Sequence, residues 1–226
     1  MRFNTVSRDR GQVLCQDACA PMPASLASAS TRPATAHTTE PGGPTMITAA
    51  ELKDRRIATR HEDDPGLAEV ENLKARLARA RDKRGPLYLS RDEVLSICRW
   101  KLADQYSRAA RLLESNSEKR IRRTTQMAFS CKDKDAGFEL AARVTILRLL
   151  PGVGMGVASA ILALCYPKRY APVDSRVWLS LFDEQRGSFE PVDYERCLAR
   201  LNELAAEVRT LDPKGAWTVQ LVGYYA

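Results

Sequence analysis

Apolar side chains recur at intervals of three and four residues along most of the chain from residue 48 onward. This spacing places them on one face of a helix, and the alternating pattern of a half-buried strand is absent from the sequence. The pattern therefore predicts an all-α fold. Helices are expected over about 67–84, after Ser90, over about 105–114, 117–130, 135–149 and 157–165, from about 173, around 198–208, and from Asp212-Pro213 onward.

Local signals add detail to this pattern. Ser90 and Glu93 have the spacing of a capping box, in which each side chain accepts a hydrogen bond from the backbone N–H of the other residue. Trp178 and Trp217 fall on apolar stripes, so both are expected in the core.

The N-terminal segment has a different composition. Residues 1–45 are rich in Ala, Ser, Thr and Pro and lack apolar periodicity, which predicts a disordered extension. The folded domain is expected to cover residues 46–226. Met46 is an alternative start of the chain, and a transit peptide is a second alternative, although Asp9 and Asp17 are unusual in such segments.

Charge and hydropathy narrow the class of protein. The 226-residue chain has a formal net charge of +7, which permits nucleic-acid binding without establishing it. No apolar run has the length needed to span a bilayer, and the first residues lack the apolar segment of a secretory signal. We expect a cytoplasmic protein, nucleoid-associated in a bacterium, with no membrane partner; the sequence indicates no protein partner.

Cysteine and histidine usage bears on cofactors. The six cysteines have neither the spacing of a zinc ribbon nor that of an iron–sulfur set, so no metal and no other cofactor is expected. The two histidines, His37 and His61, both precede the expected core. This argues against histidine-based triads and most metal hydrolases.

The stretch 149–182 carries the strongest functional signal. Pro151, Gly152, Val153 and Gly154 form a turn between two helical patterns. Glycine can adopt positive φ and lets another backbone approach, while the helix that follows offers free N–H groups and the positive end of its dipole. The turn is therefore suited to hold a DNA phosphate without regard to sequence. A tight helix–helix connection that binds nothing is the alternative.

Asp174 follows at the start of the next helical stripe, where the helix end favours its ionised form. A carboxylate beside docked nucleic acid could stabilise a positively charged sugar or orient an attacking water. Cleavage of an N-glycosidic bond needs such a group. A plain helix cap is the alternative.

These residues resemble the signature of the helix-hairpin-helix (HhH-GPD) DNA glycosylases, which read L-P-G-V-G-x-K-x-A and then V-D-x-H-V. The local run P-V-D-S-R-V-W is most similar to the 8-oxoguanine branch. The resemblance implies two helical subdomains that flank a cleft, a helix-hairpin-helix motif at about 136–165, and extrusion of a damaged base from duplex DNA. It places Asp174 at the catalytic aspartate, and Pro151, Gly152, Val153, Gly154 and Gly156 at the DNA-contacting hairpin.

The sequence departs from this pattern at two positions. Gly156 stands where lyase members of the family have a lysine, so hydrolysis without Schiff-base strand cleavage is expected. Arg176 stands where the family has a histidine, and an arginine can hold a phosphate at any physiological pH. The iron–sulfur loop of some members is absent.

Further candidates lie outside the signature. Trp100 and Lys101 could border a base pocket, but core packing of Trp100 and extension of Lys101 to solvent are the favoured interpretation. Lys168 and Arg169, between the turn and Asp174, are expected to contact DNA. The basic residues Lys119, Arg120, Arg122 and Arg123 are interpreted either as a DNA-binding surface or as a solvated helix face.

The leading hypothesis is a DNA glycosylase of base-excision repair that hydrolyses the N-glycosidic bond of a damaged or mismatched base. A non-catalytic DNA-binding protein of the same fold is the alternative, and a helical protein–protein adaptor is a third.

Overall fold

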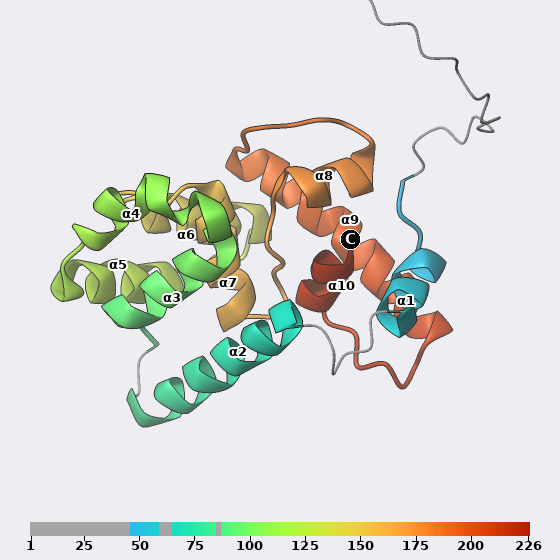
Figure 1. Cartoon of the computed structure of the whole chain (residues 1–226), viewed down its shortest axis with the longest axis horizontal. Coiled ribbons are helices and arrows are strands. Elements are labelled where there is room, and N and C mark those ends of the chain that lie inside the picture. The colour runs from blue at the N-terminus through green and yellow to red at the C-terminus, as the bar shows by residue number, and fades with distance from the viewer. Residues whose placement is uncertain (1–45, 59–64, 85–86) are drawn as a thin grey trace, which may run out of the picture. The chain divides into compact units, whose positions relative to one another are not determined.

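The computed structural model describes residues 46–58, 65–84 and 87–226, and these residues form helices and connecting loops without a strand (Figure 1). The predicted all-α class is confirmed. The predicted disordered extension and both histidines lie outside the described residues. The helices are α1 (Ala49–Ala58), α2 (Pro65–Arg84), α3 (Arg91–Leu102), the 3-10 helix η1 (Ala103–Gln105), α4 (Tyr106–Glu114), α5 (Glu118–Ser130), α6 (Ala136–Leu147), α7 (Met155–Cys165), α8 (Ser175–Phe182), α9 (Pro191–Leu211) and α10 (Val219–Tyr225).

Helix α7 is the central helix of its neighbourhood. All of its residues except Gly156 are buried, and it packs against α2, α3 and α6. A helix that is apolar all round can be stable only inside a protein, because it has no face to present to water. The segment after the turn is therefore fixed in place by the core.

Helix α9 organises the rest of the described chain. It packs against α1, α6, α8 and α10, so the first described helix lies beside the last (Figure 1). The buried Tyr194 of α9 also donates a hydrogen bond from its hydroxyl to Ala171 O (2.8 Å), in the loop that leads to α8. This contact helps to fix the segment that carries Asp174.

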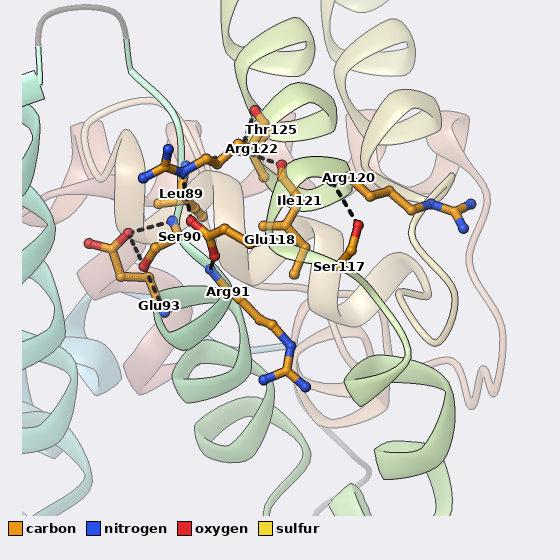
Figure 2. A network of polar contacts seen from close by, with 10 residues as sticks. All are labelled: Leu89, Ser90, Arg91, Glu93, Ser117, Glu118, Arg120, Ile121, Arg122 and Thr125. Carbon is orange, nitrogen blue, oxygen red and sulfur yellow. Dashed lines mark hydrogen bonds and ion pairs between the residues drawn. The ribbon is translucent and has the colours of Figure 1, made fainter.

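A polar network joins the start of α3 to α5 (Figure 2). Ser90 and Glu93 form the predicted capping box. Leu89 N donates to Thr125 Oγ1 (3.0 Å), and Arg91 N donates to Glu118 Oε2 (2.7 Å). The bond to Thr125 is buried and the bond to Glu118 is exposed, and together they attach the start of α3 to α5. The last turn of α3 carries Trp100 and Lys101.

The start of the last helix differs from the sequence prediction. Asp212 is the C-cap of α9, and its Oδ2 accepts a hydrogen bond from the Trp217 indole N–H (2.9 Å). Thr218 caps α10 instead, accepting from Leu221 N (3.1 Å). The Asp212-Pro213 pair therefore ends a helix and does not begin one. Trp217 precedes α10, and it is buried as predicted, like Trp178 of α8.

Candidate functional site

The turn between α6 and α7 is built on its inner side against α4. Gly152 has a φ of +82°, and a Cβ added there would lie 2.9 Å from Leu113 Cγ and 3.0 Å from Leu113 N. The buried Asn116 amide donates to Pro151 O (2.9 Å) as well as to two carbonyl groups of α4. Glycine is thus required at 152 for two separate reasons, conformation and space.

The outer side of the same turn is open. Gly154 is the N-cap of α7 with a φ of −88°, no side chain caps the helix there, and nothing lies within 4 Å of an added Cβ. The first N–H groups of α7 consequently have no intrahelical partner. Val153 is buried, and its N–H donates to Leu150 O (3.0 Å), so Gly154 is the exposed residue of the turn on this side. The geometry suits an anion that approaches Gly154.

Asp174 uses its two carboxylate oxygens differently. Oδ1 accepts from Arg176 N and Val177 N (both 3.0 Å), which makes Asp174 the N-cap of α8. Oδ2 accepts from Lys101 Nζ at 2.7 Å. The Asp174 side chain is 36% exposed. Asp174 is therefore a cap and also one half of an ion pair that remains open to solvent.

The surroundings of Asp174 hold its carboxyl ionised. Burial by itself raises the pKa of this carboxyl, but the Lys101 ammonium and the two backbone N–H groups lower it by more, so the pKa lies below its usual value. A negative charge is present at this position throughout the neutral range. Such a charge can stabilise a developing cation near it.

A single serine ties Asp174 to the beginning of α7. Ser159 Oγ accepts from Val173 N (2.9 Å) and donates to Gly156 O (2.8 Å). A Cβ added to Gly156 would lie 3.5 Å from Val173 O. The residue before Asp174 thus lies directly against the first turn of α7, the same turn that presents its N–H groups beside Gly154.

Asp174 and Lys101 line a pocket of about 600 Å³. Residues from four helices and the loop before α8 form its walls, which brings together parts of the chain that are remote in sequence. They are Arg55, Ala58, Trp100, Lys101, Pro172, Asp174, Arg176, Val177, Gly223, Tyr224, Tyr225 and Ala226.

The pocket changes the interpretation of Trp100 and Lys101. Trp100 is partly buried and packs against the core, but it also lines the pocket. The expected extension of Lys101 to solvent is wrong: its side chain is 10% exposed, and its amine is turned inward to Asp174. A buried charge needs a partner, and Asp174 is the partner of Lys101.

The other predicted contact residues are distributed over different surfaces. Arg176 is exposed and lines the pocket. Lys168 is exposed outside it, and Arg169 forms an ion pair with Glu139 (3.0 Å). In the basic cluster of α5, Arg120 donates to Leu149 O (2.8 Å), so the start of α5 lies beside the turn.

Sequence reasoning missed most of the pocket wall, including Arg55 and Tyr224. Arg55 of α1 donates to Tyr225 O and Ala226 O (both 2.9 Å), and Tyr224 of α10 lies beside it in the wall. Neither residue belongs to a local motif. Their contribution depends on the packing of α1 against α10, which no periodicity in the sequence reveals.

The described ranges are 46–58, 65–84 and 87–226. Those ranges contain no group of three or more His, Cys, Asp or Glu side chains arranged to hold a metal ion. Within them no helix combines the length and apolar character of a membrane span.

Comparison of the chain with protein-family models, with curated proteins and with solved structures found no match.

Proposed function

We propose that the protein is a DNA glycosylase that acts in base-excision repair and breaks the N-glycosidic bond of a damaged or mismatched base in duplex DNA. In this proposal, α6, the turn and α7 form the helix-hairpin-helix motif, and the pocket is the cleft between two helical subdomains. The class of base is left open.

One observation carries the proposal. The ionised Asp174 lies at the wall of a pocket, and the residue before it contacts the first turn of α7. A backbone phosphate held at Gly154 would thereby bring the neighbouring nucleotide close to a fixed negative charge. A phosphate site without the Asp174 carboxylate would support DNA binding alone. The carboxylate without a phosphate site would have no substrate held beside it.

The chemistry required of Asp174 matches its surroundings. When the bond between C1′ and the base breaks, positive charge develops on the sugar, and a preorganised carboxylate lowers the energy of that transition state. The two N–H groups of α8 and the Lys101 amine fix the orientation of the carboxylate before substrate arrives. This preorganisation avoids a rearrangement during the reaction.

The pocket supplies what an extruded base needs. A volume of about 600 Å³ is ample for one nucleotide and lies within the range of about 300–1,000 Å³ that is usual for ligand pockets. Trp100 and Tyr224 offer aromatic surface for stacking, and the guanidinium groups of Arg55 and Arg176 can bind phosphate. Shape and charge thus both favour a nucleotide.

The test is a panel of duplexes carrying oxidised, alkylated, deaminated and mismatched bases, assayed for free base. Wild type should release at least one of them, and Asp174→Asn should release none while binding duplex nearly as well. Asparagine is as good an N-cap as aspartate, so the fold should survive the change.

Asp183→Asn is the matched control. Asp183 is an exposed residue at the other end of α8 with a φ of 56°, a conformation that asparagine tolerates well. It should leave base release unchanged. Full activity in Asp174→Asn would refute the catalytic role.

The runner-up function is a non-catalytic DNA-binding protein. Its supporting observation is that both oxygens of Asp174 already have partners within the fold. In that case wild type would bind duplex with affinity that falls steeply with salt, and it would release no base from any duplex of the panel.

A further inference from the structure

Lys101 occupies an unusual position for a lysine. It lies in the last turn of α3, its side chain is 10% exposed, and its amine faces the pocket wall beside Asp174. An ammonium has three N–H donors, and among the described residues Asp174 alone accepts a hydrogen bond from it. The remaining donors are available to a molecule in the pocket.

Gly156 leaves the space that Lys101 uses. A Cβ at 156 would lie 3.8 Å from Lys101 Cε and 3.5 Å from Val173 O, which is ordinary van der Waals contact. An alanine would therefore fit, whereas a longer side chain would extend into the path of the Lys101 chain. The absence of a side chain at Gly156 of α7 thus leaves room for the Lys101 side chain of α3.

We propose that Lys101 is a catalytic amine nucleophile that forms a covalent Schiff base with the sugar of the extruded nucleotide. The inference rests on the proposed function and deepens it. It gives the site a strand-cleaving activity, although the residue at 156 cannot supply an amine. The nucleophile comes from α3 instead of α7 and reaches the same carboxylate.

The covalent step balances within the site. The Lys101 ammonium transfers one proton to the departing base, its nitrogen forms a bond to C1′, and the bond from C1′ to the base breaks with its electron pair. The bond from C1′ to the ring oxygen then breaks, that oxygen takes a second proton from nitrogen, and an iminium remains. Loss of a proton from C2′ expels the 3′ phosphate, and water finally hydrolyses the imine to release lysine.

Asp174 has a defined part in these steps. Its Oδ2 lies 2.7 Å from Nζ, so it orients the amine and compensates the positive charge of the iminium. Lys101 therefore serves as both proton donor and nucleophile, and the proposed steps need no second amine.

The experiment uses duplex DNA with a preformed abasic site together with borohydride, which reduces an imine to a stable covalent bond. Because an abasic aldehyde condenses with an amine without base excision, this substrate tests Lys101 independently of glycosylase activity. Wild type should form a covalent protein–DNA adduct, and peptide mapping should place it on Lys101. Lys101→Arg should form none, because arginine keeps the positive charge but is not a nucleophile at neutral pH.

Two controls separate catalysis from structure. Lys134→Arg changes an exposed lysine between α5 and α6 and should trap like wild type. Lys101→Arg should unfold at nearly the wild-type temperature, since it can still pair with Asp174. A purely structural role of Lys101 predicts that this variant still traps.

The outcomes distinguish the two proposals. Adduct formation at another lysine, trapping by Lys101→Arg, or no adduct in wild type would each overturn the role of Lys101. Base release from the lesion panel without an adduct would leave a hydrolytic glycosylase and reject only the inference. Trapping at Lys101 without release of any base would support the amine and reject the glycosylase.

Discussion

Replacing Gly152 and Gly154 by alanine, one at a time, should separate the two sides of the turn. At Gly152 an alanine would have to hold a φ of +82°, and its Cβ would lie 2.9 Å from Leu113 Cγ and 3.0 Å from Leu113 N. At Gly154 the φ of −88° suits any residue, and no atom lies within 4 Å of an added Cβ. The same chemical change therefore meets two opposite environments.

The expected magnitudes follow from these geometries. For Gly152→Ala, left-handed backbone costs about 1–2 kcal/mol and overpacking against Leu113 about 1–3 kcal/mol, so the free energy of unfolding should fall by about 2–5 kcal/mol. Each kcal/mol lowers the melting temperature of a chain of this size by about 2–4 °C. Gly154→Ala should cost at most about 1 kcal/mol, because alanine is a somewhat poorer N-cap than glycine.

Duplex binding should show the reverse order. A methyl group at 154 lies on the open side, where the proposed phosphate approaches, so Gly154→Ala should weaken duplex binding in a protein that remains folded. Chemical denaturation followed by circular dichroism gives the stabilities, and fluorescence anisotropy with labelled duplex gives the affinities. Equal stabilities of the two variants would refute the packing argument. An unchanged affinity of Gly154→Ala for duplex would refute the proposed phosphate site at Gly154.

Two further predictions concern thiols and acid. Burial raises the pKa of Cys98 and of Cys197 to about 12. In the native protein both thiols should therefore react with a thiol reagent far more slowly than the partly exposed Cys131. Mass mapping of the labelled protein checks this, and equal reaction rates would contradict it. The pKa of Asp174 is lowered in the fold, so its ion pair and cap stabilise the protein above the unfolded value of about 3.9, and this contribution is lost as the pH falls through the folded value. Denaturation midpoints measured below about pH 4 should therefore fall more steeply for wild type than for Asp174→Asn, and parallel curves would show that the charge of Asp174 does not matter.

Lys101 and Asp174 form one ion pair, so a change at either residue affects both side chains. Changing Asp174 removes the partner of a nearly buried ammonium, so a loss of activity in Asp174→Asn reports on both side chains. The Lys101→Arg variant keeps the charge at 101, and the two variants together separate the roles of carboxylate and amine.

The helical class and the positions of most helix ends follow from the sequence alone. The capping box of Ser90 and Glu93, the helix cap at Asp174 and the burial of Trp178 depend on neighbours a few residues away, and all three are present in the structure. Spacing along the chain contains this information because a helix brings residues three and four apart onto one face. The prediction that Asp212-Pro213 begins the last helix is wrong. The Asp212 carboxylate accepts a hydrogen bond from the nearby Trp217 indole and does not cap a helix N-terminus.

The residues that lie opposite Asp174 depend on the tertiary fold. Lys101 is 73 residues away from it in the chain, and Arg55 lies on a helix that packs against the last one. No local pattern encodes such pairs, because they depend on the angles at which α1, α3, α8 and α10 meet. The sequence showed that Gly156 provides no amine, and the fold showed that the space beside this glycine is used by the amine of another helix.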